Sequence, residues 1–386
     1  MLLTKCASCA AELGLTSGKK CGRCATRYCG PACQKKHWEE GGHDQLCKKI
    51  KRGGGAEQFH ANTKYAEAVA VAVTKCADDT KGQTCYICTQ ALHWKTKEGL
   101  VRMCACRGTA GFAHVSCLAE QAKILCDEAE ENSLADKALN KRWHRWFECS
   151  LCEQEYHGVV SCAFGWACWK TYVGRPETDG FRCLAINRLG NGLLNAERYA
   201  DALSVQEAYL SLLRRFGSPE LDMLNVQGNL AISYQVLGRF EEAMSMRQDV
   251  YSGYSKLLGE ECYETLLAAN NYANCLLALR RAKEAKPLMR KMIPVAQRAL
   301  GKGHETTLRI SWHYARALCE ADGATLDDHL EAVTTLEDAG RIARRVLGGM
   351  HPFTGVIEDS LRRSRAALRA HGEVSSICEG VGAMTT

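Results

Sequence analysis

Cysteines and histidines that recur in close pairs are the residues most suited to chemistry in this sequence. Residues 6–47 contain Cys-x-x-Cys twice, then Cys-x-x-x-Cys and His-x-x-x-Cys; residues 85–152 contain Cys-x-x-Cys, Cys-x-Cys, His-x-x-Cys and Cys-x-x-Cys. Thiolate and imidazole are the ligands of closed, four-coordinate zinc sites. We therefore predict four zinc ions. The candidate ligands are Cys6, Cys9, Cys21, Cys24, Cys29, Cys33, His43, Cys47, Cys85, Cys88, Cys104, Cys106, His114, Cys117, Cys149 and Cys152.

Two other uses of these residues are less favoured. Disulfides are typical of oxidising compartments, but Met1-Leu2-Leu3 runs directly into Lys5 without the apolar segment of a secretory signal, so we expect a cytoplasmic or nuclear protein. A lone histidine is commonly a satisfied polar group in a core. His114, however, is accompanied by seven thiols in paired spacing, which core packing does not explain.

Metal sites of this kind have a structural role. When protein ligands occupy all four positions no water is activated, so we predict no catalytic residue among them. A segment of about 45 residues buries too little apolar surface to fold alone, and each structural zinc contributes roughly 10–16 kcal/mol. Zinc binding would therefore drive the folding of these segments.

The first segment resembles the MYND finger over its full length, through Tyr28-Cys29-Gly-Pro-Ala-Cys33 followed by His43-Asp-Gln-Leu-Cys47. The resemblance implies interleaved pairs. One zinc would bind Cys6, Cys9, Cys29 and Cys33, and the other Cys21, Cys24, His43 and Cys47. His37 is a rival ligand that we place second. The resemblance also implies contacts with proteins, often with proline-containing peptides. The SET domain that accompanies some MYND fingers has no matching motif here.

The second segment has the ligand order shared by PHD fingers, which read histone tails, and RING-CH fingers, which recruit ubiquitin-conjugating enzymes. The single residue between Cys104 and Cys106 and the seven between Cys106 and His114 resemble RING-CH, as do "CRGTAGFAHVSCL" and "FECSLCEQEYHG". The resemblance implies one zinc on Cys85, Cys88, His114 and Cys117 and the other on Cys104, Cys106, Cys149 and Cys152.

The resemblance leaves two alternative functions. One is a ubiquitin ligase, and the other is a scaffold that no longer recruits a conjugating enzyme. Ile87 has the apolar character of the family's docking residue, whereas Gln121 stands where many members have tryptophan. Glu153 follows the last ligand, where ligases frequently carry a basic or polar residue. Trp143 and Trp146 are candidates to replace the missing aromatic or to pack in the core. Whether the chain is an enzyme stays open.

The elements that must carry these residues are mainly helical. Residues Tyr65 to Val73 predict a short helix after a Gly53–Gly55 joint, and Ala119 to Ala138 predict a second helix. From Val159 onward the chain is helical in pattern and repeats with a period near 42 residues. The repeated residues are Ala231, Ala273 and Ala315; Ala243, Ala285 and Ala332; and Leu-Gly at 258–259, 300–301 and 347–348.

The phrases "NLAISYQVLGRFEEA" and "NYANCLLALRRAKEA" resemble the tetratricopeptide repeats of kinesin light chains. The resemblance implies a concave groove that binds extended peptides through asparagines, here Asn229 and Asn271. Helix-surface solvation or a hydrogen bond between repeats is an equally weighted alternative for both asparagines. Arg280 stands where the preceding repeat has Gly238, which predicts different helix packing in that repeat.

Charge and hydropathy exclude some partners. Of the net charge of +6, residues 1–52 hold +7, from 11 basic and 4 acidic residues, which leaves about −1 for the remainder. Because these charges are scattered with few aromatic residues between them, nucleic acid is disfavoured as a partner. The most apolar run, Val159 to Trp169, is about half of the ~20 residues that span a membrane.

The prediction is a mainly α protein in which two small cross-braced zinc modules precede an α-α superhelix of tetratricopeptide-like repeats. Its expected partners are proteins or peptides in the repeat groove, with a ubiquitin-conjugating enzyme as a further candidate. The expected boundaries are 1–52 for the MYND-type finger, 53–80 for a linker with a short helix, 81–158 for the RING-CH-type finger, 159–370 for the repeats and 371–386 for a disordered tail.

Overall fold

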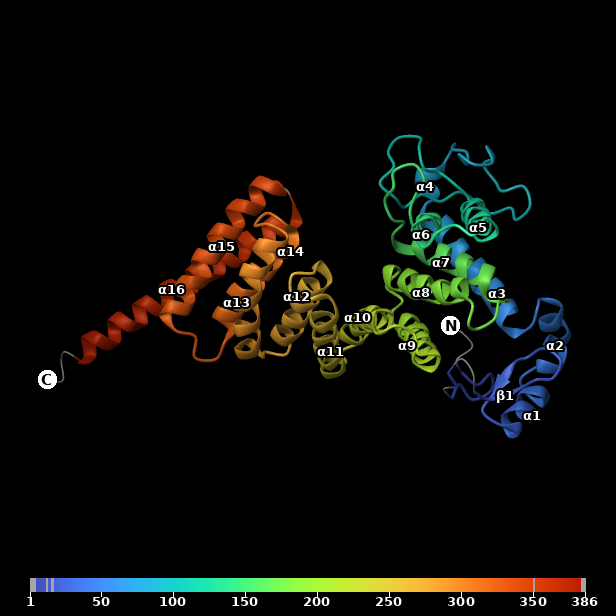
Figure 1. The fold of residues 1–386 in the computed structure, drawn as a ribbon, viewed down its shortest axis with the longest axis horizontal. Helices are drawn as coiled ribbons and strands as arrows, with labels where there is room; N and C mark the ends of the chain where they lie inside the picture. Colours follow the sequence, from blue (N-terminus) through green and yellow to red (C-terminus); the bar gives the residue numbers. More distant parts are fainter. Residues whose placement is uncertain (1–4, 12, 15–16, 350, 383–386) are drawn as a thin grey trace. The chain divides into compact units, whose positions relative to one another are not determined.

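The computed structural model describes residues 5–11, 13–14, 17–349 and 351–382. Its internal contacts divide the chain into two compact units, Met1–Pro219 (unit 1) and Glu220–Thr386 (unit 2). The described residues are mainly helical, and their only regular sheet is a two-stranded hairpin (Figure 1). The predicted fold class is therefore confirmed.

Unit 1 consists of irregular cysteine-rich loops and helices. Its strands β1 (Lys19–Lys20) and β2 (Arg27–Tyr28) are antiparallel, with Lys19 opposite Tyr28. Its helices are α1 (Pro31–Glu39), α2 (His43–Arg52), α3 (Ala56–Lys75), α4 (Ala77–Thr80), α5 (Val115–Glu131), α6 (Asp136–Trp143), the 3-10 helix η1 (His144–Trp146), α7 (Gly158–Tyr172), α8 (Gly180–Asn195) and α9 (Tyr199–Phe216).

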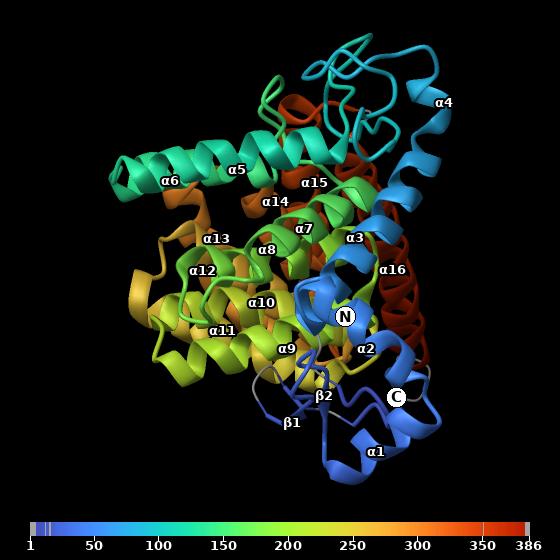
Figure 2. The ribbon, with the colours of Figure 1, turned by 90° about the vertical axis from the view of Figure 1, so that its right-hand side faces the viewer.

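Helix α7 is the centre of unit 1. It packs against α3, α5 and α8, and Figure 2 shows α3 and α8 beside it. Nearly every side chain of α7 is buried, which its sequence anticipates because apolar residues lie all round it. Gly192 of α8 lets the two backbones approach: a Cβ there would lie 2.7 Å from the Ser161 carbonyl oxygen. Helix α7 thus joins the second finger to the helices around it.

Two boundaries expected from the sequence lie among helices that pack on one another. Residues 53–80 are expected to be a linker with a short helix, but α3 spans 20 residues and its buried face packs on α7. The repeat region is expected to begin at residue 159, yet α7, α8 and α9 fall within unit 1. Composition and periodicity do not determine which elements a uniformly apolar helix packs against. From the sequence alone, α7 is therefore grouped with the repeats.

Unit 2 is a succession of paired helices in which each packs on the next (Figure 1). They are α10 (Glu220–Val236), α11 (Phe240–Leu258), α12 (Tyr263–Ala278), α13 (Ala282–Ala299), α14 (Glu305–Glu320), α15 (Leu326–Val346) and α16 (Pro352–Gly382). Helix α14 also contacts α12 and α16, so alternate helices share one side of the unit. This is the arrangement expected of stacked two-helix repeats.

The repeated residues occupy equivalent structural positions. Ala231, Ala273 and Ala315 are completely buried, as are Ala243, Ala285 and Ala332, because a methyl side chain permits close approach of neighbouring helices. Gly259, Gly301 and Gly348 all have positive φ angles, of 83°, 87° and 92°. Glycine adopts this conformation without strain, which explains its recurrence where a helix ends.

Arginine in place of glycine at position 280 leaves the turn between the paired helices unchanged. Arg280 has a φ of 57°, and the matching Gly238 has a φ of 77°, so both turns are left-handed. Both are followed by the same hydrogen bond pattern, since the next residue donates its N–H to a carbonyl five positions earlier. Arg280 therefore adopts the same turn as glycine, at the free-energy cost of placing a non-glycine residue in the left-handed region.

The C-terminal region differs from the expected disordered tail over part of its length. Helix α16 continues to Gly382, so residues 371–382 are helical, while 383–386 lie outside the described residues. Within the part of the chain that the structure describes, no helix has the length and apolar character needed to cross a bilayer.

Candidate metal centres and binding grooves

Four sets of Cys and His ligand atoms lie together in unit 1. Within each set, the atoms are all within 4.8 Å of one another. The sets are Cys6, Cys9, Cys29 and Cys33; Cys21, Cys24, His43 and Cys47; Cys85, Cys88, His114 and Cys117; and Cys104, Cys106, Cys149 and Cys152. All sixteen sequence-predicted ligands are present, in the interleaved arrangement that the two resemblances imply.

Sulfur–sulfur separations fit metal ligation and not disulfides. The Cys29 and Cys33 Sγ atoms are 3.4 Å apart, those of Cys21 and Cys47 3.9 Å, and those of Cys106 and Cys149 3.7 Å. A tetrahedron with Zn–S bonds of about 2.3 Å has edges of about 3.8 Å, whereas a disulfide bond is about 2.05 Å long. The donor set of thiols and imidazoles also suits zinc.

The four Cys-x-x-Cys pairs share one backbone turn. The residue after each second cysteine has a positive φ of 55–62° and donates its N–H to the carbonyl of the first cysteine, at 2.8–3.0 Å. These residues are Ala10, Ala25, Thr89 and Glu153. None of them is glycine, so each turn carries conformational strain that its surroundings must offset. The recurrence shows four copies of a loop built to aim two sulfurs at one point.

The structure separates the two rival histidines of the first finger. His43 Nε2 lies 3.5 Å from Cys24 Sγ and the residue is fully buried. His37 lies outside the tetrad: its Nδ1 is 3.0 Å from the Tyr28 hydroxyl, and its ring packs 5.1 Å from that of His43. His37 therefore supports the ligand histidine and does not join the ligand set.

His114 is oriented from both ring nitrogens. Its Nδ1 lies 3.3 Å from Cys88 Sγ and 3.5 Å from Cys117 Sγ, while Nε2 is 3.3 Å from the Ala91 carbonyl oxygen. Donation from Nε2–H to that carbonyl leaves the Nδ1 lone pair free for a metal, the usual outer contact of a ligand histidine. Burial lowers the pKa of His114, which also favours the neutral, metal-binding form.

The fourth tetrad already favours a thiolate. A hydrogen bond with Cys104 lowers the pKa of the Cys149 thiol, and the same contact raises the pKa of Cys104. Gly111 lies against this tetrad with a φ of 85°, and a Cβ there would be 2.6 Å from the Cys106 Cβ. Sequence analysis did not single out Gly111, although a glycine amid ligand cysteines is a signal for close approach.

The aromatic residues of the second finger separate into core and surface. Trp143 and Trp146 are buried and pack with Tyr172, so neither replaces the absent docking tryptophan at Gln121. Trp94 is instead 68% exposed, and sequence analysis missed it. Trp94, Ile87 and Gln121 line the same pocket of about 890 Å³, which we call the finger pocket.

The predicted peptide-contacting asparagines also come together. Asn229 of α10 and Asn271 of α12 line one cavity of about 270 Å³, whose walls come from α10, α11 and α12. Arg247 of α11 also lines it and is buried, and Glu264 of α12 lines the same cavity. The Arg247 Nη2 donates to the Gln235 side chain at 3.2 Å. We call this cavity the asparagine groove.

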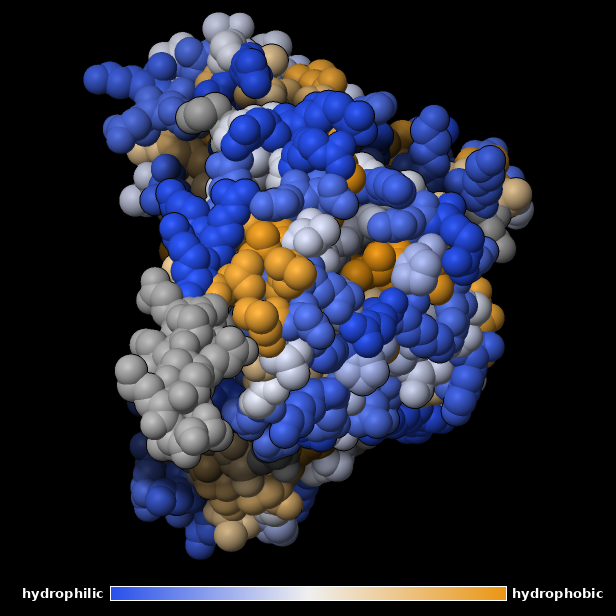
Figure 3. All heavy atoms as spheres, turned by 90° about the vertical axis from the view of Figure 1, so that its left-hand side faces the viewer, coloured by the Kyte–Doolittle hydropathy of each residue, from blue (hydrophilic) through white to orange (hydrophobic). Residues whose placement is uncertain are grey.

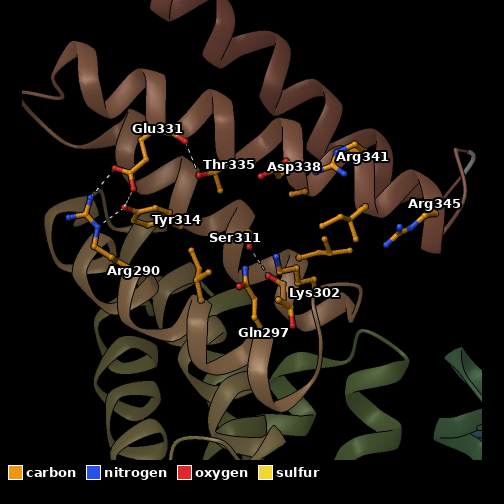
Figure 4. Close-up of a pocket in the computed structure, with 15 residues that line it drawn as sticks. Arg290, Gln297, Lys302, Ser311, Tyr314, Glu331, Thr335, Asp338, Arg341 and Arg345 are labelled. Carbon is orange, nitrogen blue, oxygen red and sulfur yellow. Dashed lines mark hydrogen bonds and ion pairs between the residues drawn. The ribbon is translucent and has the colours of Figure 1, made fainter.

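A more polar cavity of about 480 Å³ lies among α13, α14 and α15 (Figure 4). Arg290 donates to Tyr314 and Glu331, and Arg341 pairs with Asp338, so much of its charge is neutralised internally. The face drawn in Figure 3 is likewise dominated by hydrophilic side chains, with apolar residues gathered in a few patches. We assign no ligand to this cavity.

Comparison with known families identifies two parts of the chain. The MYND finger family matches residues 6–47. The N-terminal module is a MYND finger. A tetratricopeptide repeat family matches residues 224–261 and 265–306, which are the α10–α11 and α12–α13 pairs of unit 2. The second cysteine–histidine module holds two further tetrads, but it is not identified as a RING-CH finger. A comparison with curated proteins found no match.

Three solved structures are similar to part of this chain. Two are crystal structures of nearly identical TPR-like repeats from a predicted kinesin light chain of Podosopora anserina, the first of them a single-substitution variant. They are 18% and 19% identical, with TM-scores of 0.41 and 0.40, and each alignment covers 60% of this chain and 97% of the other. A third, BtubC (BKLC) from P. vanneervenii, is 14% identical with a TM-score of 0.33, covering 66% and 92%.

Proposed function

We propose that this protein is a zinc-dependent adaptor whose repeats bind an extended peptide in the asparagine groove. The MYND finger and the tetratricopeptide repeats are both protein-interaction modules. The four tetrads bind one zinc ion each in this proposal, which makes the fingers rigid platforms. We propose boundaries of 1–52 and 81–158 for the two fingers, with the repeat groove in unit 2.

The observation that carries the peptide proposal is the convergence of Asn229 and Asn271 from separate helices on one groove. A carboxamide offers both a donor and an acceptor, so it can pair with the N–H and C=O of an extended backbone whatever the side chains are. Arg247 adds a buried positive charge to the same wall. A carboxylate in the peptide would partner that guanidinium, since charge-assisted hydrogen bonds are stronger than neutral ones.

The test is peptide selection with matched variants. The intact zinc-loaded protein is applied to a peptide array, and retained peptides are titrated against wild type, Asn229→Ala/Asn271→Ala and Asn140→Ala. Asn140 is an exposed asparagine on α6 and serves as the control. Loss of two backbone hydrogen bonds predicts at least a tenfold weaker affinity for the double variant alone. Equal affinities for all three proteins would contradict the proposal.

We propose ubiquitin transfer only as a second candidate function. It is supported by Ile87, which is 36% exposed and shares the finger pocket with the exposed Trp94. Gln121 and Glu153 oppose it, and the closed tetrads leave no position for metal-activated water. A ligase of this kind would act by positioning a charged conjugating enzyme. The alternative is a scaffold whose second finger binds proteins without promoting transfer.

Self-ubiquitination with a broad panel of conjugating enzymes distinguishes these alternatives. Wild type is compared with Ile87→Ala, which removes the apolar docking residue, and Cys88→Ser, which removes a zinc ligand. Ubiquitin chains that form with wild type and are lost in both variants would support ligase activity. Chains that persist in both variants exclude the finger as their source, and no chains with any enzyme would favour the scaffold.

A further inference from the structure

We propose that the finger pocket binds a segment of a partner protein in which a large apolar side chain neighbours a carboxylate, with Trp94 and Ile87 contacting the apolar group and Lys170 pairing with the carboxylate. The pocket lies entirely in unit 1, between the 85–96 loop, α5 and the end of α7. It is separate from the asparagine groove of unit 2. This inference therefore does not depend on peptide binding by the repeats or on ubiquitin transfer.

Apolar side chains at the surface form the first half of the site. Trp94 is 68% exposed, Ile124 46% and Ile87 36%, and all three line the pocket. Monomeric proteins rarely leave contiguous large apolar residues in water without a use, and tryptophan is enriched among the residues that dominate interface energetics. The pocket of about 890 Å³ is large enough for several side chains of a partner.

The loop that carries Trp94 is held in place by hydrogen bonds around His93. His93 donates its N–H to the Glu98 carbonyl at 3.0 Å, Lys97 donates to the His93 carbonyl at 2.9 Å, and the Thr96 N–H donates to His93 Nδ1 at 3.1 Å. The His93 ring packs 5.4 Å from that of the ligand histidine His114. Because His93 packs on the third tetrad, zinc bound there would hold the backbone that carries Trp94, which lowers the entropic cost of binding.

Lys170 forms the second half of the site. Its side chain is partly buried, and its Nζ lies 4.0 Å from the centroid of the Tyr65 ring. The Lys170 backbone carbonyl accepts from Gln58, but the ammonium group makes no hydrogen bond or ion pair with a described residue. Burial lowers the pKa of Lys170, and the Glu98 carboxylate acts in the opposite direction. A partly buried ammonium without an acceptor gains from a ligand carboxylate that restores its lost hydration.

The other charges near the pocket do not supply that carboxylate. Glu98 already accepts hydrogen bonds from the Tyr65 hydroxyl at 3.1 Å and the Ser116 N–H at 2.6 Å. Glu120 and the cations Lys95 and Lys123 also line the pocket, and Lys123 pairs with Asp127. Among the residues that line the pocket, three lysines therefore accompany one carboxylate, Glu120. Glu98 keeps its charge because both of its hydrogen bond donors are neutral, but it does not line the pocket. An apolar segment with a negative charge is complementary to this surface.

The proposal can be tested with two small fluorescent probes on the intact zinc-loaded protein. The probes are 8-anilinonaphthalene-1-sulfonate, an apolar anion, and its uncharged relative N-phenyl-1-naphthylamine. Lys170→Met removes the charge but keeps an apolar stem, Trp94→Ala removes the indole, and Lys141→Met changes an exposed lysine of α6 as a control. Zinc content and melting temperature establish that each variant is folded.

We expect Lys170→Met to weaken binding of the sulfonate about tenfold while changing binding of the neutral probe less than about twofold. Trp94→Ala should weaken both, and Lys141→Met neither. Equal loss of both probes in Lys170→Met, or unchanged binding of the sulfonate in that variant, would overturn the role of the charge. Unchanged binding of both probes in Trp94→Ala would overturn the site itself.

Short peptides identify the partner chemistry in a second step. Peptides with Phe or Leu beside Asp or Glu compete with the sulfonate, and each is paired with the same peptide carrying Asn or Gln instead. Displacement of the sulfonate by the acidic peptides, but not by their Asn or Gln counterparts, supports the proposal. Equal displacement by the two sets of peptides, or displacement by neither set, overturns it. A third outcome would show that the pocket is a conjugating-enzyme site, and the proposal would fail. In that outcome Trp94→Ala abolishes self-ubiquitination, whereas Lys170→Met changes neither self-ubiquitination nor the competition by peptides.

Discussion

Three histidines of the cysteine-rich modules differ in the contacts of their two ring nitrogens. His114 reaches its tetrad with Nδ1 because Nε2 is held by the Ala91 carbonyl. His43 reaches its tetrad with Nε2, and its buried Nδ1 has no hydrogen bond partner among the described residues. His37, six residues earlier, is held away from the thiols by Tyr28. The same residue type thus lies within a tetrad at positions 43 and 114 and packs beside one at position 37.

The two histidines of the MYND finger should differ in their effect on metal content. His43→Ala removes a ligand, so we expect one fewer zinc ion per chain than in the wild type. His37→Ala should retain the full zinc content with only a modest loss of stability. Elemental analysis of both purified variants measures this. Loss of zinc from His37→Ala with retention in His43→Ala would reverse the ligand assignment.

His313 of α14 should make unit 2 sensitive to acid. Burial lowers the pKa of His313 to about 3, and Arg316 and Arg309 act in the same direction. An unfolded histidine has a pKa of about 6.5, so between these values the unfolded state binds more protons. The contribution of neutral His313 is therefore complete above about pH 6.5. It is lost as the pH falls towards 3, by up to about 1.4 kcal/mol per pH unit.

The comparison is with His313→Gln, which keeps a donor for the Asn270 carboxamide oxygen that lies 3.0 Å from His313 Nδ1. The free energy of unfolding of both proteins is measured in urea at pH 7 and pH 5.5. Hydrogen–deuterium exchange in α14 monitors the unfolding. We expect the wild type to lose more stability than the variant over this interval. Parallel losses in the two proteins would show that His313 does not carry the effect.

At the scale of elements, the turns keep one shape even where the residue changes. The loops after the four Cys-x-x-Cys pairs share one left-handed position although it is occupied by alanine, threonine or glutamate. The helix ends of the repeats also have positive φ angles, at Gly259, Gly301 and Gly348. The backbone geometry is therefore tied to the convergence of the cysteine pairs on the tetrads and to helix stacking in the repeats, and the side chains adapt to it.

Arg280→Gly should stabilise unit 2. A non-glycine residue in the left-handed region costs about 1 kcal/mol, and the equivalent Gly238 shows that glycine suits the same turn. Part of the gain is offset because glycine makes the unfolded chain more flexible. We expect a net increase of about 0.5 kcal/mol in the free energy of unfolding, measured in urea. Lower stability than the wild type would indicate that the Arg280 side chain makes a compensating contact.

At the scale of the whole molecule, stability has two physical origins. Unit 1 holds all four tetrads and packs its second finger on α7, whose buried side chains include Trp166 and Phe164. Unit 2 holds none of the tetrads and has a continuous core that runs from α12 to α16, including Leu276, Met292 and Leu336. Metal should therefore matter to one unit far more than to the other.

Chelation should unfold the fingers selectively. After treatment with a zinc chelator we expect limited proteolysis to cleave within residues 5–157, while a fragment covering residues 220–370 persists. The same chelator saturated with zinc is the control. Protonation of the ligands should produce the same pattern as the pH falls, because cysteine and histidine bind metal in their deprotonated forms. Resistance of the fingers to cleavage without metal would contradict zinc-driven folding.

The sequence by itself determined the features that depend on residues close together in the chain. Ligand pairs are separated by one to three residues, and helical repeats follow a period of about 42, so both are visible as spacing. Only the tertiary structure decided which residues meet across long separations. It buried Trp146 and left Trp94 exposed, attached α7 to the fingers, and brought Lys170 to a pocket formed around Ile87. Such packing depends on the shapes of many distant side chains at once, which local spacing does not encode.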